Sequence, residues 1–178
     1  DYVNPMLGTA TLWDSVDLGF KPTKRTWGAE VFPGSSLPNA MVQVSPVTKF
    51  HSGAGYQYED SVIYGFTHTN KGHWNLCHIP LLPVTGTPTP GDYCSPFSHE
   101  RESAAPGYYQ VFLDRYGVDA QLSSTLRCAF HKYTYPAGAA ASLLADLQRS
   151  NEHVRAWDIR KEGDNVFAGW QQTGEKMY

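Results

Sequence analysis

Short apolar or alternating runs, broken at regular intervals by glycine and proline, constrain the fold of this chain more than any other feature. The chain contains 16 glycines and 12 prolines, and the runs recur about every eight to twelve residues. This spacing is typical of an all-β sandwich or barrel with little helix. We predict antiparallel strands at Met41–Ser45, Gly55–Tyr58, Val62–His68, His78–Val84, Tyr108–Leu113, Val118–Cys128, Phe130–Tyr135 and Ser142–Asp146.

The clearest alternation lies in Val118–Cys128, which follows a turn at Arg115–Gly117. Successive side chains of a strand point to opposite faces, so an antiparallel sheet can bury one set and expose the other. The predicted buried face carries Val118, Ala120, Leu122, Ser124, Leu126 and Cys128. The predicted wet face carries Asp119, Gln121, Ser123, Thr125 and Arg127.

The C-terminal region predicts a hairpin of Val154–Arg160 and Val166–Gln172 around a turn at Gly163–Asn165. Residues 1–178 have the length of one domain, and we treat them as a single β-sandwich domain. A strand-like run approaches Glu175–Tyr178 without a closing turn. We therefore expect the domain to be incomplete at its C-terminus, because a strand that stops there leaves unpaired backbone groups at a sheet edge.

Charge and hydropathy exclude several classes of function. Charged residues make up 17% of the chain, against about 25% in an average domain, and the net charge is −3 with no basic block. This composition argues against nucleic-acid binding. No apolar run reaches the ~20 residues of a membrane helix, and the N-terminus has no signal-peptide pattern. Neutral polar and aromatic groups suit sugars, so we expect a secreted, polysaccharide-facing domain.

The densest group of candidate binding residues is His68–His78, between two predicted strands. His68, His73 and His78 are spaced by five residues, which places neighbours on opposite faces of a strand and apart on a helix, so a three-histidine metal site is disfavoured. Trp74 could stack on a pyranose while His73 and Asn75 bond its hydroxyls. Composition does not decide between this sugar contact and a tryptophan that closes the end of the sandwich.

Other candidate sites favour structural explanations. Glu100 and Glu102 resemble a carboxylate pair for glycoside hydrolysis, but they flank Arg101 and are better explained as a salt-bridged turn. The pairs Cys77–His78 and Cys128–His131 are poorly aligned for nucleophile activation. A charged stretch between Asp14 and Glu30 reads as a surface loop. The three cysteines, Cys77, Cys94 and Cys128, match no zinc motif and do not fix the redox compartment.

Several motifs, in order, resemble the N-terminal domain of glycoside hydrolase family 92. Val3–Thr9 is similar to the family's opening V-N-P-F-I-G-T, and Phe32–Pro46 resembles F-P-G-A-x-L-P-F-G-M-V-Q-x-S-P. Further similar stretches are Gly55–Tyr58, Ile63–Thr69, Phe97–Glu100 with Pro106–Tyr109, and Leu122–Arg127 with His131–Pro136. Asn39–Ala40 and Asn70–Trp74 depart from the family pattern in loops expected near substrate, which leaves the linkage specificity open.

The resemblance implies a galactose-mutarotase-type supersandwich joined to a C-terminal (α/α)6 catalytic domain that this sequence does not contain. It implies a calcium-dependent, inverting exo-α-mannosidase that hydrolyses terminal α-mannosides of glycans and is secreted, periplasmic or at the cell surface of a bacterium. The general acid, the general base and the calcium ligands would belong mostly to the missing domain. By position, Trp74 is the expected sugar contact, with His73, Asn75 and His68 beside it. The alternative is a free-standing carbohydrate-binding module without catalysis.

Overall fold

The computed structural model of the chain describes residues 3–11, 19, 30–70, 76–89 and 91–174. Nearly all regular structure in these residues is antiparallel β-sheet, and the helical part is one three-residue 3-10 turn, η1 (His99–Arg101). The predicted all-β fold with little helix is therefore confirmed. Within the same residues, no helix is long and apolar enough to cross a membrane.

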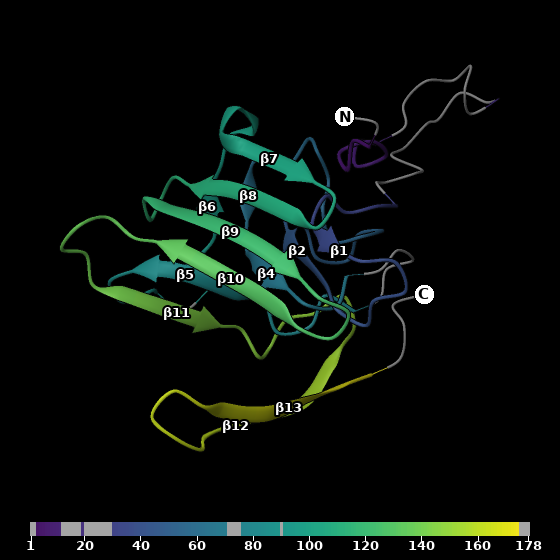
Figure 1. The fold of residues 1–178 in the computed structure, drawn as a ribbon. Coiled ribbons are helices and arrows are strands. Elements are labelled where there is room, and N and C mark those ends of the chain that lie inside the picture. Colours follow the sequence, from purple (N-terminus) through teal and green to yellow (C-terminus); the bar gives the residue numbers. More distant parts are fainter. Residues whose placement is uncertain (1–2, 12–18, 20–29, 71–75, 90, 175–178) are drawn as a thin grey trace.

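Two sheets form the body of the molecule (Figure 1). The larger sheet has the order β1 (Ser35–Ser36), β2 (Gln43–Val47), β4 (Gly65–Thr67), β5 (Leu81–Thr85) and β11 (Ala141–Ala145). The second sheet has the order β10 (Ala129–Thr134), β9 (Val118–Ser124), β8 (Tyr108–Leu113) and β7 (Glu102–Ala105). Two smaller pairs join β3 (Val62–Ile63) to β6 (Ser95–Pro96) and β12 (Val154–Lys161) to β13 (Phe167–Thr173).

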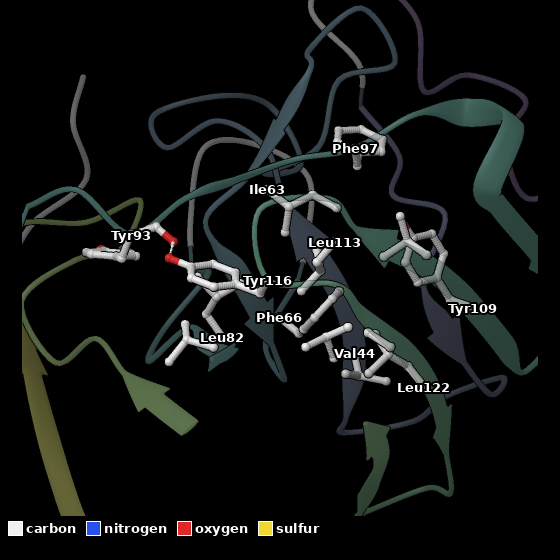
Figure 2. Packing of buried hydrophobic residues seen from close by; sticks show 14 of the residues in the cluster. Val44, Ile63, Phe66, Leu82, Tyr93, Phe97, Tyr109, Leu113, Tyr116 and Leu122 are labelled. Atoms are coloured by element: carbon white, nitrogen blue, oxygen red, sulfur yellow. Dashed lines mark hydrogen bonds between the residues drawn. The ribbon is translucent and has the colours of Figure 1, made fainter. Parts of the chain in front are cut away.

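The hydrophobic core lies between the two main sheets, where side chains from every second strand position meet (Figure 2). Phe66 from β4 and Leu82 from β5 are fully buried, and they belong to one cluster with Val111 from β8 and Leu122 from β9. Burying such a side chain contributes about 1.5–3 kcal/mol, so contact between the sheets is the main source of stability. The alternation predicted for β9 is observed from Val118 to Leu122.

The predicted strand Val118–Cys128 is too long, because β9 ends at Ser124. The backbone N–H of Thr125 donates to the carbonyl of Cys128 at 2.8 Å and closes a turn. In this turn Leu126 is 53% exposed, and Cys128 is exposed as well. The predicted burial of these two residues is therefore wrong. The alternation of apolar residues continues in the sequence beyond Ser124, although these residues form a turn outside the sheet.

The predicted strand Val62–His68 is in fact two strands that belong to different sheets. Ile63 pairs with Ser95 in the small β3–β6 pair, whereas Phe66 pairs with Pro46 and Leu81 in the larger sheet. The chain therefore changes sheets at Tyr64, which sequence alternation does not reveal. β1, β6 and β7 were not predicted, and β2 and β5 begin later than Met41 and His78.

The stretch Gly55–Tyr58, predicted as a strand, is irregular although largely buried. Gly55 has a φ of 80°, and a Cβ at this position would lie 2.5 Å from the sulfur of Cys77. Only glycine satisfies both conditions without a shift of the backbone. The close approach breaks the extended conformation, so an apolar pattern here does not produce a strand.

Glu102 is a buried carboxylate, and the predicted turn is present as η1, where Glu102 contacts His99 and not Arg101. It accepts hydrogen bonds from the hydroxyls of Tyr56 at 2.9 Å and Tyr109 at 2.5 Å, and its other oxygen lies 2.5 Å from Nδ1 of His99. Burial raises the pKa of both tyrosines, and the nearby Glu102 charge raises it further. Arg101 instead pairs with Asp114. Glu102 therefore ties β7 to β8 and to the irregular Tyr56 region.

The predicted C-terminal hairpin is confirmed. β12 and β13 pair from Val154↔Thr173 to Lys161↔Phe167, with one register shift between Val154 and Ala156. The hairpin lies beside the end of the sandwich that carries β11 and extends away from the two main sheets (Figure 1). Alternating residues across a polar turn thus predicted all four strand boundaries to within one residue.

Replacing Leu122 and Leu126 separately tests where the buried face of β9 ends. Leu122 is 1% exposed, so Leu122→Ala is expected to lower the free energy of unfolding by about 2–5 kcal/mol. Leu126→Ala, in the exposed turn, is the matched control and should change it by less than about 0.5 kcal/mol. Urea unfolding of both variants measures the difference. Equal losses would mean that the strand continues to Cys128.

Candidate functional site

His68 follows β4 and contacts a second histidine that the sequence analysis did not place with it. Its Nε2 atom lies 2.7 Å from Nε2 of His131 in β10, and Nδ1 of His131 lies 2.6 Å from the hydroxyl of Tyr133. Burial lowers the pKa of His68. Burial and the neighbouring His68 lower that of His131 to about 4. Both rings are therefore neutral at pH 7, and one nitrogen of the close pair donates while the other accepts.

The other three predicted sugar contacts, His73, Trp74 and Asn75, lie outside the described residues. The residues that flank this segment are described on both sides, and we call Asn70 and Leu76–His78 the anchor residues. Asn70 is fully buried, and its amide donates to the carbonyls of Gln43 at 2.9 Å and Thr67 at 3.0 Å. The segment that carries Trp74 is therefore preceded by a residue fixed to β2 and β4.

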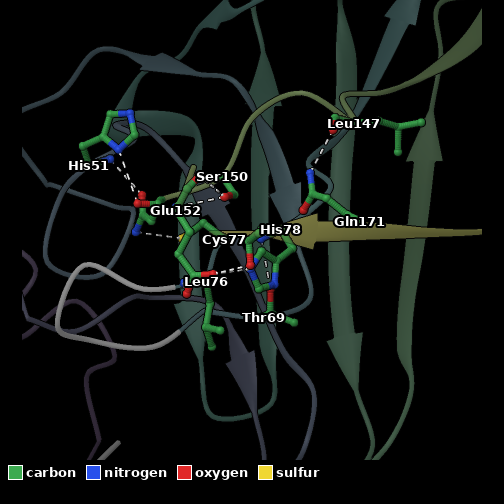
Figure 3. Close-up of polar contacts among 11 residues, drawn as sticks. His51, Thr69, Leu76, Cys77, His78, Leu147, Ser150, Glu152 and Gln171 are labelled. Carbon is green, nitrogen blue, oxygen red and sulfur yellow. Dashed lines mark hydrogen bonds and ion pairs between the residues drawn. The ribbon is translucent and has the colours of Figure 1, made fainter. Parts of the chain in front are cut away.

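Cys77 and His78, which follow the segment, form hydrogen bonds to Thr69, the residue next to Asn70. The N–H of Cys77 donates to the carbonyl of Thr69 at 2.8 Å, and the N–H of His78 donates to the hydroxyl of Thr69 at 3.0 Å. Thr69 thus joins the two sides of the segment directly (Figure 3). Both flanks therefore lie against the end of the larger sheet.

The backbone of the second flank is strained. The φ angles of Leu76, Cys77 and Ile79 are 64°, 56° and 48°, in the left-handed region that side chains with a Cβ disfavour. Each such residue costs on the order of 1–3 kcal/mol and persists only where surrounding contacts enforce it. Strain of this kind is concentrated at binding and catalytic sites, so this conformation favours a functional role for the adjoining segment.

Asn151, in the segment between β11 and β12, supplies part of the enforcing contacts. It is fully buried, and its Oδ1 accepts the N–H of His51 at 2.8 Å while its own N–H donates to the carbonyl of Leu76 at 2.9 Å. Its amide also donates to the carbonyl of Ser52 at 3.3 Å. One side chain and its backbone therefore hold together the anchor residues and the loop after β2.

Glu152 adds a charged contact to the same arrangement (Figure 3). Its carboxylate accepts the N–H of Leu76 at 3.3 Å and the hydroxyl of Thr173 at 2.5 Å, and it lies 3.4 Å from Nε2 of His78. Burial raises the pKa of Glu152, but the hydrogen bonds from Thr173, Leu76 and His78 outweigh burial and lower it overall. Glu152 is therefore ionised at pH 7 and connects the anchor residues to β13.

A groove of about 620 Å³ opens beside Glu152. Its walls combine the rings of Phe50 and Tyr64 with the polar side chains of Lys49, Gln148 and Arg149. The guanidinium of Arg149 lies over three aromatic rings, at 5.2 Å from the centroid of Tyr93 and 5.6 Å from that of Tyr64. Aromatic faces alternating with hydrogen-bonding groups can bind sugars, and this groove adjoins the anchor residues through Glu152.

The described residues bear on two alternatives weighed from the sequence, a three-histidine metal site and a cysteine nucleophile. The ring of His78 faces Glu152 and that of His68 faces His131, so these two histidines do not converge. The described part of the chain holds no group of three or more His, Cys, Asp or Glu side chains able to bind a metal. Cys77 is fully buried, and burial raises the pKa of its thiol to about 12, which makes it a poor nucleophile.

His131, Asn151 and Glu152 are the site residues that sequence reasoning missed. The sequence held a signal for the contact between His131 and Tyr133. The two residues are two positions apart in a predicted strand, so their side chains share one face of the sheet. No pattern pointed to Asn151 or Glu152. They lie about 75 residues from the anchor residues that they hold, a pairing that only the fold creates.

Known proteins resemble this chain along nearly its whole length. The family model described as "Glycosyl hydrolase family 92 N-terminal domain" matches residues 2–178. A family GH92 α-mannosidase from Bacteroides thetaiotaomicron, solved in complex with mannoimidazole, has a TM-score of 0.82 and 28% identity over 96% of this chain. The GH92 family glycosyl hydrolase CcMan5 has a TM-score of 0.72 and 26% identity over 97% of the chain.

A family GH92 inverting mannosidase from Bacteroides thetaiotaomicron VPI-5482 is similar over 83% of the chain, with a TM-score of 0.67 and 26% identity. The chain spans only 22%, 24% and 19% of these three solved proteins, respectively. A search of curated proteins found no match. The similarity to CcMan5 and the mannoimidazole-bound mannosidase therefore covers nearly all of this chain, and most of each relative lies outside the matched region.

The histidine pair predicts a pH dependence of stability. The folded pKa of His131, about 4, is below its ordinary value of 6.5, so protons bind the unfolded chain preferentially as pH falls from about 6.5 to 4. We expect this group to remove at most about 3 kcal/mol of stability across that window, with the full contribution present above it. Proton NMR of the folded protein should give a midpoint near 4 for His131. A midpoint near 6.5 would contradict the buried pair.

Proposed function

The chain belongs to glycosyl hydrolase family 92, and on that premise we propose that it forms the N-terminal part of a calcium-dependent, inverting exo-α-mannosidase acting on terminal α-mannosides of glycans. In this proposal it contributes substrate-binding residues to an active site shared with a C-terminal (α/α)6 catalytic domain. The chain alone would be inactive. Support comes from the mannoimidazole-bound relative, which is a family GH92 α-mannosidase.

The observation that carries the proposal is the hydrogen bonding of both flanks of residues 71–75. Asn70 is bonded to Gln43 and Thr67, and Leu76 is bonded to Asn151 and Glu152. Binding groups are most effective when a rigid scaffold holds them, because the cost of ordering them is met before the ligand arrives. A segment that contains His73, Trp74 and Asn75 between two hydrogen-bonded flanks, the second of which is strained, fits that requirement.

We assign roles to the predicted residues on chemical grounds. Trp74 would stack its indole on the apolar face of the terminal mannose, while His73 and Asn75 would bond hydroxyls. The ring of His68 has fewer atoms available to bond a sugar than the sequence suggested, because its Nε2 contacts His131. A contact from His68 to sugar would therefore use Nδ1, and the His131–Tyr133 pair would fix the orientation of the ring.

The proton-transfer groups and calcium ligands would come from the C-terminal domain. Inverting hydrolysis needs one carboxylic acid to protonate the leaving oxygen and one carboxylate to activate water on the opposite face. In the described residues, the buried Glu102 is committed to Tyr56, Tyr109 and His99, and Glu152 to the anchor residues. The same residues contain no group of three or more His, Cys, Asp and Glu side chains that could hold a metal ion.

A glycan-degrading enzyme of this kind would meet its substrate outside the cytoplasm. We therefore propose a bacterial protein that is secreted, periplasmic or displayed on the cell surface. Two of the similar mannosidases come from Bacteroides thetaiotaomicron, a bacterium, which is consistent with such a source.

Release of mannose tests the proposal. The chain joined to the following polypeptide of its own gene should hydrolyse p-nitrophenyl α-mannoside, produce β-mannose as the first anomer in proton NMR, and lose activity on chelation of calcium. The chain alone should show no turnover. Trp74→Ala in the joined protein should lower kcat/KM by about 10- to 100-fold, equal to about 1.4–2.7 kcal/mol of lost transition-state binding.

Phe130→Ala is the matched control, because Phe130 is an aromatic residue on β10 that is 68% exposed and lies outside the predicted contact segment. It should leave kcat/KM unchanged, and both variants should keep the wild-type melting temperature. Turnover by the chain alone at the rate of the joined protein would overturn the shared-site proposal. Glycan-array binding by the chain together with an inactive joined protein would favour a free-standing carbohydrate-binding module.

A further inference from the structure

Three side chains, Tyr133, His131 and His68, form a line of hydrogen bonds between the two main sheets, and we call them the histidine bridge. Tyr133 and His131 lie on one face of β10, and His68 follows β4 in the other sheet (Figure 1). The hydroxyl of Tyr133 lies 2.6 Å from Nδ1 of His131, and Nε2 of His131 lies 2.7 Å from Nε2 of His68. Each of these two contacts is a hydrogen bond and therefore contains one proton.

The histidine bridge carries three protons at neutral pH. Burial raises the pKa of Tyr133, so its hydroxyl keeps its proton. Burial lowers the pKa of both histidines, and a neutral imidazole carries a single N–H. The two contacts use two of the three protons. The third proton must therefore lie at one end of the bridge, either on Nδ1 of His68 or on the far side of the Tyr133 hydroxyl.

The surroundings of Tyr133 decide between these two arrangements. Its ring packs against the core, with its centroid 6.3 Å from that of the fully buried Phe66. In the described part of the chain, the hydroxyl of Tyr133 has no hydrogen-bond partner besides His131. A hydroxyl proton turned away from His131 would therefore lose its bond beside apolar groups, which is costly. Tyr133 thus donates to His131, and His131 donates from Nε2 to His68.

This direction of hydrogen bonding leaves the proton of His68 on Nδ1. Its Nε2 accepts the bond from His131, and a neutral ring then carries its one N–H on the other nitrogen. No residue that the structure describes bonds Nδ1 of His68. His68 is half-buried and directly precedes Thr69 and Asn70, on the first flank of residues 71–75. The free N–H therefore belongs to a residue beside the predicted sugar-binding segment.

We propose that Tyr133 and His131 are positioning residues that make Nδ1 of His68 a hydrogen-bond donor to an acceptor oxygen of the sugar substrate. This inference rests on the proposed function, and it specifies which atom of His68 meets which kind of ligand atom. A sugar hydroxyl or ring oxygen has lone pairs that can accept the bond. A protonated amine on the sugar at that position would place two donors face to face, so an amino sugar is disfavoured there.

Nitrogen-15 NMR of the histidine side chains tests the proton arrangement in the chain alone, without a sugar. At pH 7 it should place the proton of His68 on Nδ1 and that of His131 on Nε2. Tyr133→Phe and Tyr135→Phe are matched variants, because the hydroxyl of Tyr135 bonds the carbonyl of Ser142 outside the histidine bridge. Tyr133→Phe should shift part of the His68 population to a proton on Nε2, and Tyr135→Phe should not. A wild-type His68 protonated on Nε2 would overturn the proposal.

Kinetics of the joined protein test the bond to substrate. Tyr133→Phe should raise KM for p-nitrophenyl α-mannoside about 3- to 10-fold with kcat nearly unchanged, because the bond is present in both the bound substrate and the transition state. His68→Asn keeps an N–H donor and should bind substrate more tightly than His68→Asp, which only accepts.

Equal KM values for His68→Asn and His68→Asp would show that His68 does not donate to the sugar, and would overturn the proposal. A joined protein without any mannosidase activity would instead contradict the proposed function, and the proton positions measured by NMR would still show whether Tyr133 and His131 set the donor on His68.

Discussion

The hydrogen bonds of Asn151 hold together parts of the fold that the sequence keeps far apart. Its side chain and backbone bond His51, Ser52 and Leu76, and its amide lies 3.5 Å from the sulfur of Cys77. A fully buried amide is expensive to leave without partners, typically about 1–3 kcal/mol for each lost bond. The loop after β2, the anchor residues and the start of β12 are therefore mutually dependent, and the groove beside Glu152 forms where they meet.

This dependence explains how a strained backbone can persist next to the predicted sugar-binding segment. Left-handed φ angles at Leu76, Cys77 and Ile79 are unfavourable in isolation. They are offset because Leu76 bonds both Asn151 and Glu152, and Cys77 bonds Thr69. Stability from the core thereby offsets the cost of fixing the two flanks of residues 71–75. In the proposed function, this pre-organisation would hold the segment in one geometry for a partner domain.

Sequence patterns predicted those parts of the fold that depend on local alternation. The bounds of β8 agree with Tyr108–Leu113, and the β12–β13 hairpin was predicted because both strands alternate around a polar turn. Tyr64 shows where this reasoning fails, since the chain changes sheets there without any change in pattern. Gly55 shows the other limit, because its contact with Cys77 is long-range and decides against a strand. At the site, His68 was recognised from a motif, but its partner His131 and the contacts of Asn151 arise from tertiary structure alone.

We expect the residues on both sides of segment 71–75 to be rigid before any sugar or partner domain is bound. Amide exchange at Asn70, Leu76 and Cys77 in the chain alone measures this most directly, because their N–H groups are bonded to Gln43, Glu152 and Thr69. We expect protection comparable to that of the core strands β8 and β9. Exchange at these three amides as fast as in the exposed turn after β9 would show that the flanks open freely and would contradict it.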